Sequence, residues 1–456
     1  MSSPSNFLGS HVVVIGGGMA GLLSAHVLTR YFERVSLIER DSYPEKPVFR
    51  AGTPQGRHVQ TILIRGQQIL EEFFPGLKDK LIAHGAVESD FMADYIYRFP
   101  SGWASRTSSR LKGFSCSRPL LEWLVRQEVI TCKRIQIIEK HEVVNLLTSN
   151  DRRSITGVQM RARNSKAYME HELLDLPADL VVDTSGRDSH VLHWFKAIGY
   201  TPPPETVINP FFGYSSRQYI PSVDYKRTWK AMLVQALPPQ DRRGILVLPI
   251  EGNNWLVVLA GTGKDYPPTD ETGFLDFIKS IPDPTLHEAL QNAQPSSSIY
   301  GYRRTESRLR HFEQLTRLPA GFVALGDAVC AFNPVHGQGT TAAALGVKAF
   351  DACLRQQHQS DMASFPYHFQ RKLAKVNELP WQWAKASDYY VPGIEGMQLK
   401  RIEELTYRYL GSVIGLLPTA PSVNKTFIEV KHMVKAPIAL LHPSIVAKVL
   451  LHKFSH

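Results

Sequence analysis

The chain has 456 residues, of which 43% are hydrophobic and 21% are charged, and this globular composition excludes a disordered, collagen-like or fibrous protein. The formal net charge is +10, and the last 52 residues, from Leu405 onward, hold six Lys/Arg against one Asp/Glu, which is half of that excess. Such a basic balance is compatible with nucleic acid, an anionic membrane surface or an anionic cofactor as the partner.

The four cysteines form no C-x-x-C pair, which excludes a zinc ribbon and a disulfide-rich secreted scaffold. No uninterrupted apolar stretch approaches the roughly 18 residues of a membrane span, and the first ten residues lack the features of a signal peptide. No metal-ligand motif such as H-E-x-x-H is present. The sequence therefore predicts a cytoplasmic protein without a metal site.

A nucleotide-binding pattern opens the chain. A buried strand is predicted over residues 11–15, a helix over 22–30 and a second strand over 34–38. The glycine-rich turn between the first strand and the helix has the spacing G-x-G-x-x-G, and an acidic residue follows about 20 positions later. In this pattern Gly16 makes the turn, Gly18 lets the backbone approach a pyrophosphate, and Gly21 allows close packing of helix on strand. The pattern predicts a dinucleotide site, with NAD and FAD both open.

A second glycine-rich segment lies far along the chain. A short apolar strand at 321–325 ends in Gly326-Asp327, and a loop over 333–339 leads into a predicted helix at 340–354. Asp327 can accept a hydrogen bond from a ribityl hydroxyl, and the start of the helix favours negative charge on a nearby ring. An NAD dehydrogenase does not need this second loop. An ordinary strand–loop–helix turn without a ligand does not need an aspartate, a proline and two glycines at these places. The segment therefore favours FAD over NAD as the dinucleotide.

Together the two motifs resemble the FAD-dependent monooxygenases of the hydroxybenzoate-hydroxylase type. Further resemblance comes from Arg50-Ala51-Gly52, from the stretch 115–124 and from the strand end at 180–189, where Thr184 and Ser185 separate Asp183 from Gly186. The likeness is strongest to the squalene-epoxidase-like flavin epoxidases of bacterial polyether biosynthesis. The resemblance and the motifs assign these cofactor-binding residues: Gly16, Gly18, Met19, Ala20, Gly21, Glu39, Arg40, Arg50, Arg118, Asp183, Gly326, Asp327, Pro334, Gly337 and Gly339.

The expected fold is α/β, with a Rossmann-like FAD-binding domain, a mixed β-sheet substrate domain and a helical C-terminus. We expect the FAD-binding domain over 1–190 and 305–355, the substrate domain over 191–304 and the helical region over 356–456. Four apolar segments predict strands of the substrate sheet at 211–219, 231–237, 244–250 and 255–261. Phe211, Tyr214 and Trp255 are the candidates for its pocket.

The resemblance implies insertion of one oxygen atom from O2 through a flavin C4a-hydroperoxide. Epoxidation of an alkene in a lipophilic polyketide- or isoprenoid-like substrate of secondary metabolism is favoured over aromatic hydroxylation. NAD(P)H supplies the electrons, directly or through a separate flavin reductase. His58 is the one catalytic candidate, as a neighbour of the flavin, although a structural histidine fits the pattern equally well.

Three other functions are alternatives to this one, and two basic segments have interpretations of their own. A geranylgeranyl-reductase-type enzyme shares both motifs, and Trp381-Gln382-Trp383 resembles the W-x-W of flavin halogenases, although no lysine suited to hypohalous acid is evident. A nucleic-acid-binding nucleotide module is disfavoured because no aromatic residues interleave with the basic ones. The basic cluster at 302–311 is expected to be a solvated face. The basic C-terminus is expected either to close the substrate domain or to sit on a membrane surface.

Overall fold

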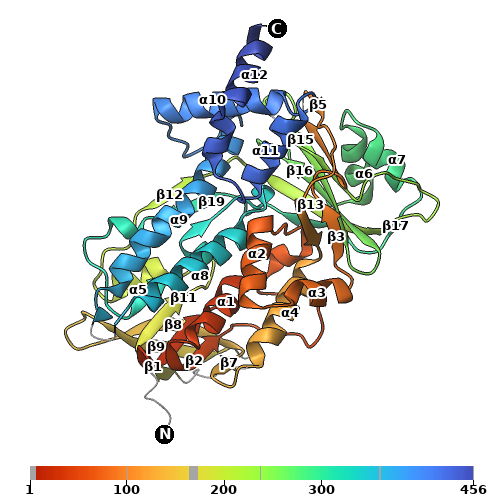
Figure 1. The fold of residues 1–456 in the computed structure, drawn as a ribbon. Helices are drawn as coiled ribbons and strands as arrows, with labels where there is room; N and C mark the ends of the chain where they lie inside the picture. The colour runs from red at the N-terminus through yellow and green to blue at the C-terminus, as the bar shows by residue number, and fades with distance from the viewer. Residues whose placement is uncertain (1–6, 100, 164–172, 237, 359–360, 455–456) are drawn as a thin grey trace.

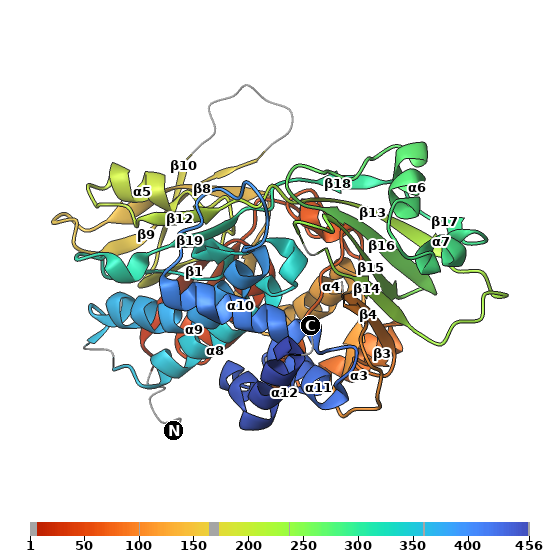
Figure 2. The same cartoon turned by 90° about the horizontal axis from the view of Figure 1, so that it is seen from above.

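The computed structural model describes residues 7–99, 101–163, 173–236, 238–358 and 361–454. Figure 1 shows the chain as two sheet-bearing halves, with the C-terminal helices at one end. Seen from above in Figure 2, the parallel sheet with its small neighbours lies beside the large antiparallel sheet. The fold is therefore mixed α/β with a helical C-terminal region, as the sequence predicts.

A five-stranded parallel sheet forms the first half, in the order β20-β11-β1-β2-β7. Its strands are β1 (Gly9–Ile15), β2 (Phe32–Ile38), β7 (Ile135–Ile138), β11 (Leu180–Asp183) and β20 (Phe322–Ala324). The last of these comes from beyond the second half, so the chain leaves this sheet and returns to it. Because the carboxyl ends of parallel strands meet at one edge, the two glycine-rich turns are brought together there.

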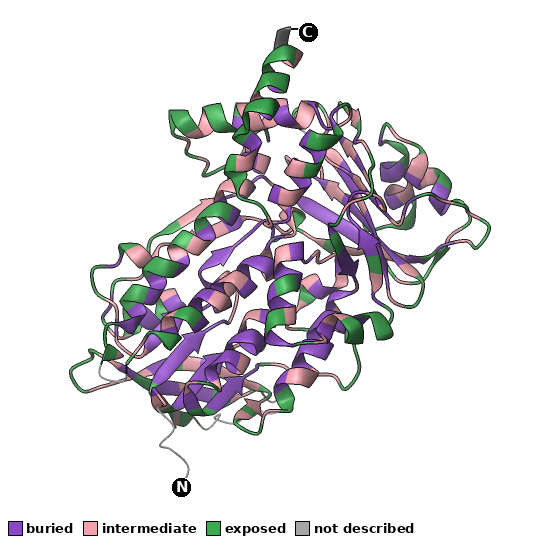
Figure 3. Ribbon diagram, viewed as in Figure 1, coloured by how far each residue is buried: buried purple, intermediate pink, exposed green. Residues whose placement is uncertain are grey.

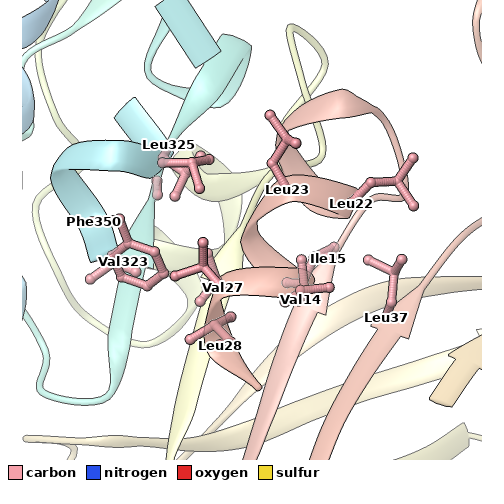
Figure 4. Close-up of a cluster of buried hydrophobic side chains, with 14 of the residues drawn as sticks. Val14, Ile15, Leu22, Leu23, Val27, Leu28, Leu37, Val323, Leu325 and Phe350 are labelled. Carbon is pink, nitrogen blue, oxygen red and sulfur yellow. The ribbon is translucent and has the colours of Figure 1, made fainter. Parts of the chain in front are cut away.

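Helices and a small sheet bury the parallel sheet. The helices that contribute to its core are α1 (Met19–Leu28), α2 (Ile64–Phe73), α3 (Leu77–Ala83), α4 (Arg118–Ile130), α5 (Val191–Ala197), α8 (Gly339–Arg355) and the start of α9 (Phe365–Asp388). In Figure 4, Val27 and Leu28 of α1 meet Val323 and Phe350 from the distant end of the chain. The antiparallel sheet β10-β9-β8 adds further core residues through β8 (His141–Thr148), β9 (Ile155–Ala162) and β10 (Leu173–Pro177).

An eight-stranded sheet dominates the second half, in the order β17-β13-β16-β15-β14-β4-β5, with β18 paired to β13. Four strands match the predicted segments: β13 (Gly213–Ile220), β14 (Ala231–Val234), β15 (Arg243–Ile250) and β16 (Asn254–Gly261). The other four strands of this sheet are β4 (Tyr95–Phe99), β5 (Gly102–Trp103), β17 (Gln294–Pro295) and β18 (Tyr300–Tyr302). The strand β4 pairs in parallel with β14, so a piece of the N-terminal segment belongs to this sheet.

Alternation along these strands gives the sheet two different faces. One face packs on α6 (Glu271–Lys279) and α7 (Thr285–Leu290) around Trp255 and Trp229. The other carries Phe212, Tyr214 and Val258 near β13 and Tyr95, Tyr97 and Phe99 near β4. Two smaller sheets complete the fold, formed by β12 (Glu205–Ile208), β19 (Ser307–Arg310) and β21 (Cys330–Ala331), and by β3 (Val87–Asp90) and β6 (Lys112–Ser115).

The C-terminal helices follow the parallel-sheet half and reach the large sheet. They are α9 (Phe365–Asp388), α10 (Arg401–Gly415), α11 (Pro421–Lys431) and α12 (Pro443–Phe454), with a 3-10 turn at Pro437–Leu441. Residues Val413, Leu417, Phe427 and Val449 are buried with Phe99 in one apolar cluster. Within the described part of the chain, no helix is both long enough and apolar enough to span a bilayer.

Candidate functional site

The two glycine-rich turns open into one cavity of about 650 Å³. This volume lies within the range of pockets that take cofactors and small ligands. The walls come from the β1–α1 turn, the end of β2, the segments 50–61 and 184–190, the strand β8 and the loop that leads into α8. Tyr214 and Tyr302 of the eight-stranded sheet form a further wall. The cavity thus lies where the two halves of the molecule meet.

At the first turn, the backbone rather than side chains faces the cavity. Gly18 is the N-cap of α1, and a methyl group added there would meet no atom within 4 Å. A methyl group added at Gly21 would lie 1.9 Å from the carbonyl oxygen of Gly16, because helix and strand are in close contact there. The first N–H groups of a helix have no partner within it, so this end of α1 suits a phosphate.

A buried ion network lies under the first turn. Glu39 accepts the Gly17 N–H at 2.8 Å, and its other oxygen lies 3.2 Å from Nη1 of Arg50. Arg50 Nε also donates to Glu122 at 2.8 Å, and Arg118 Nη2 donates to the second Glu122 oxygen at 2.9 Å. Burial acts to raise the pKa of Glu122, but Arg118 and Arg50 outweigh it and hold that pKa below its usual range. Glu122 therefore stays ionised and fixes both arginines at the cavity.

The helix α4 positions Arg118. Its N-cap, Ser117, accepts the N–H of Leu120 through its hydroxyl at 3.2 Å, and proline follows Arg118 in the first turn. Arg118 also donates to Gln60 across the cavity wall. The sequence motif at 115–124 therefore places a guanidinium that is held on one side by a carboxylate and on the other by an amide.

At the second turn, Asp327, Pro334, Gly337 and Gly339 all line the cavity. Burial raises the pKa of Asp327, although Arg187 and Arg118 act to lower it. The helix α8 starts at Gly339 without a side-chain cap, so a second helix N-terminus opens into the same space as that of α1. Behind the loop, Asn333 Nδ2 donates to Asp388 at 3.4 Å and His336 Nε2 lies 3.3 Å from the same oxygen.

These groups fit FAD. The open backbone at Gly18 suits a pyrophosphate, and the Glu39 carboxylate at the wall suits the hydroxyls of an adenosine ribose. The second turn supplies an acceptor in Asp327 and the positive end of α8 for the other half of the cofactor. No group of three or more His, Cys, Asp or Glu side chains suited to a metal occurs among the described residues.

Most of the predicted cofactor residues line the cavity. They are Gly16, Gly18, Met19, Ala20, Glu39, Arg40, Arg50, Arg118, Asp327, Pro334, Gly337 and Gly339. Gly21 and Gly326 lie beside it as packing positions, and a methyl group at Gly326 would lie 2.8 Å from Ala20. Asp183 is fully buried and accepts hydrogen bonds from Ser185 and Ser189. Asp183 thus shapes the loop that lines the cavity without facing it.

The predicted pocket residues separate into two groups. Tyr214 lines the cavity, and Tyr302 stacks on it with ring centroids 5.4 Å apart. Trp255 does not belong to the pocket and this expectation is corrected, because Trp255 points to the opposite face of the sheet and stacks on Trp229. Phe211 is also absent from the cavity wall; it has a positive φ of 48° and lies under Lys264.

His58 lies behind the tyrosine wall. It is buried, its Nδ1 lies 2.7 Å from the hydroxyl of Ser216, and its ring meets Tyr214 edge-on at 4.6 Å. Burial, together with Arg57, lowers the pKa of His58 to about 4. His58 is therefore neutral at pH 7 and supports the wall, without lining the cavity itself.

Several cavity residues were not predicted. Tyr302 and Arg304 belong to the basic cluster expected to be a solvated face; Arg304 is exposed as expected, and both residues line the cavity. Arg310 of that cluster is instead buried, and it pairs with Glu205 at 2.9 Å. The strand β8, Phe332 and Trp194 also contribute to the wall. Arg304 pairs with Asp188, so the two halves of the molecule are joined at the cavity. In the sequence, the one signal for this part of the wall is Tyr302, an aromatic residue directly before Arg303 and Arg304.

The fold and the cavity together define a flavin-binding α/β protein. Residues 10–347 match the family model described as an FAD binding domain, and the chain belongs to that family. FAD is accordingly its cofactor. Among curated relatives, Protein Rv3254 of Mycobacterium tuberculosis (strain ATCC 25618 / H37Rv) is 30% identical over 387 residues, which are 83% of this chain and 80% of that protein.

Solved structures share the fold at low sequence identity. The flavin-dependent halogenase CmlS is 15% identical with a TM-score of 0.64, over 93% of this chain and 76% of that chain. The 2-methyl-3-hydroxypyridine-5-carboxylic acid oxygenase is 17% identical with a TM-score of 0.57, over 84% of this chain and 91% of that chain. Because these two proteins differ in activity, the shared fold does not select the reaction.

Proposed function

We propose that the protein is a flavin-dependent monooxygenase that inserts one oxygen atom from O2 into a lipophilic substrate. Epoxidation of an alkene is the favoured reaction, ahead of aromatic hydroxylation. The observation that carries the proposal is the continuity of the cavity. The second glycine-rich turn, which takes the redox half of FAD, shares one space with an aromatic wall formed by Tyr214, Tyr302 and Phe332.

Bound FAD would supply the redox chemistry, and the chain would position it and exclude water. The N-termini of α1 and α8 favour negative charge on the pyrophosphate and on the reduced ring. Arg187, which donates to the carbonyl oxygen of Phe332 at 2.8 Å, adds fixed positive charge to the same wall. The stacked tyrosines, supported by His58 from behind, present an apolar surface to the substrate. This arrangement suits a substrate without charge at the reacting carbon.

Halogenation is the second candidate because a halogenase shares the fold. Against it, the described cavity wall contains no lysine. The W-x-W residues lie on α9, where Trp381 packs with Phe332 and Ala342 and Trp383 packs against Phe427. Neither tryptophan lines the cavity, so both act as packing residues of this helix. These observations support oxygen insertion over halogenation.

Incubation with isotopically heavy O2 tests the proposal. Purified protein is reconstituted with FAD and supplied with NAD(P)H, alone and with a separate flavin reductase, and is offered lipophilic alkenes and phenols. The expected product carries one labelled oxygen atom, and its formation consumes O2. Product that is saturated without O2 consumption would instead identify a reductase. Product that appears only with added halide and carries the halogen would identify a halogenase.

A further inference from the structure

Large apolar side chains are exposed at the C-terminal end of the molecule. Eight such residues of the described chain are more than half exposed, and six of them lie beyond residue 400. We call these six the C-terminal apolar surface: Ile402, Leu405, Ile438, Leu441, Leu450 and Leu451. Clusters of exposed apolar residues on a soluble domain mark interaction sites.

The elements that carry this surface are packed together at one end of the fold. Tyr409 of α10 donates to the carbonyl oxygen of Leu440 at 2.7 Å, and α12 begins directly after the 3-10 turn that holds Leu440. Figure 1 shows α10 and α12 at the same end, and in Figure 3 exposed residues predominate along α12 and along the first half of α10. The exposed apolar residues of α10, of the 3-10 turn and of α12 therefore belong to one end of the molecule.

The inner faces of these helices are already occupied. Val413, Phe427 and Val449 are buried against the large sheet. The cavity draws none of its described wall from this region, because its lining ends at Ala343. The exposed leucines and isoleucines are thus required neither to fill the core nor to close the cofactor cavity.

The C-terminal apolar surface could be covered by a second copy of the chain or by a lipid bilayer, and the charge around it distinguishes the two. From Arg401, where α10 begins, the chain carries seven Lys/Arg and three Asp/Glu, which is a net charge of +4. Lys448 is exposed on α12, and Lys425 and Lys435 are exposed on the neighbouring helix α11 and in the loop after it, where Lys435 pairs with Glu429 at 3.0 Å. A second copy of the chain would bring the same positive charge to the contact, whereas an anionic bilayer attracts each lysine and accepts the apolar side chains.

We propose that the C-terminal apolar surface docks on the anionic face of a lipid bilayer. The apolar side chains enter the interface, and Lys425 and Lys448 meet the anionic headgroups. The chain lies on the membrane without spanning it. This inference goes beyond the proposed chemistry and does not depend on it, because docking requires neither substrate nor O2.

Vesicle sedimentation of the full-length holoprotein tests the proposal. We expect binding to vesicles that contain phosphatidylglycerol and weak binding to phosphatidylcholine alone. Ile438→Asp should weaken the affinity about tenfold or more, since it removes an inserted side chain and adds a repelled charge. Lys425→Glu with Lys448→Glu should weaken it comparably, and added salt should do so in the wild type. Val223→Asp is the control, because Val223 is 91% exposed but lies in the β13–β14 loop.

Each outcome decides the proposal. Loss of vesicle binding in the C-terminal variants but not in Val223→Asp supports it, provided that all variants retain the FAD spectrum and the wild-type melting temperature. Absence of binding to anionic vesicles, or equal binding by all variants, overturns it. Concentration-dependent dimerisation that Ile438→Asp abolishes, without vesicle binding, would overturn it in favour of a second copy. Oxygen insertion is measured separately, so failure of one proposal leaves the other testable.

Discussion

Two glycines of the same turn should respond differently to the same substitution. Gly18 has φ −76° and ψ −173°, a conformation open to alanine, and an added methyl group meets no protein atom within 4 Å. Gly18→Ala should therefore change the free energy of unfolding of the apoprotein by about 1 kcal/mol or less. The methyl group would project into the cavity, where the pyrophosphate must approach the backbone.

We expect Gly18→Ala to weaken the affinity of the protein for FAD. Displacing the phosphate from one or two N–H groups removes charge-assisted hydrogen bonds that contribute about 1.5–3 kcal/mol each, which corresponds to at least a tenfold rise in the Kd for FAD. In Gly21→Ala the methyl group would lie 1.9 Å from the Gly16 carbonyl oxygen, and this contact is with backbone. That variant should destabilise the apoprotein by about 1–3 kcal/mol or more, because helix and strand must separate.

Urea unfolding of the apoproteins and titration of FAD by fluorescence quenching measure the two effects. The reasoning holds only if Gly18→Ala loses affinity at nearly wild-type stability while Gly21→Ala loses stability. Wild-type affinity in Gly18→Ala would mean that the pyrophosphate does not approach this backbone. Equal destabilisation of both apoproteins would show that the open space at Gly18 is filled in solution.

Two further predictions concern groups away from the first turn. Asp388→Asn should raise the Kd for FAD about tenfold in the same titration, because the charged acceptor that holds Asn333 and His336 behind the cofactor loop is lost. Burial, aided by a neighbouring cation, lowers the pKa of His58 to about 4 and that of His432 to about 3. Since the unfolded chain binds protons below about pH 6.5 and these folded imidazoles do not, each should cost about 2 kcal/mol of stability between pH 7 and pH 5. Urea unfolding of His58→Gln at both pH values should show a shallower loss; an unchanged slope would contradict this.

Local patterns predicted the nucleotide-binding elements well. The strand expected at 11–15 spans Gly9–Ile15, and the helix expected at 340–354 spans Gly339–Arg355. Both have a strong short-range signal, since apolar runs meet glycines at fixed spacing. The glycine roles also follow from spacing alone, because a close approach requires glycine wherever it occurs. Each of these features is determined by a small number of residues that are close together in the sequence.

Two features set by long-range pairing were not predicted. The strand β4 joins the large sheet through a parallel pairing with β14, more than 130 residues later, and no local pattern encodes that partner. Arg310 was expected in solvent because it lies among other arginines, yet pairing with Glu205 on β12 allows it to be buried. Charge runs predict solvated faces only where no distant carboxylate or carbonyl group meets them.

The two faces of the large sheet yield a last prediction, in which a wall residue and a core residue are exchanged for alanine. Trp255 is 1% exposed and stacks on Trp229 at 5.4 Å, so Trp255→Ala should cost about 3–5 kcal/mol of stability and leave the visible spectrum of bound FAD unchanged. Tyr302 is partly exposed in the cavity that also holds Asp327. Tyr302→Ala should cost less stability, about 1–2 kcal/mol, and should shift that spectrum, because it opens the flavin environment to water. Urea unfolding and absorption spectra of the two variants measure both effects. If Trp255→Ala altered the spectrum and Tyr302→Ala did not, FAD would lie on the face of the sheet that carries Trp255. That result would refute the assignment of the cavity beside Tyr302 as the FAD site.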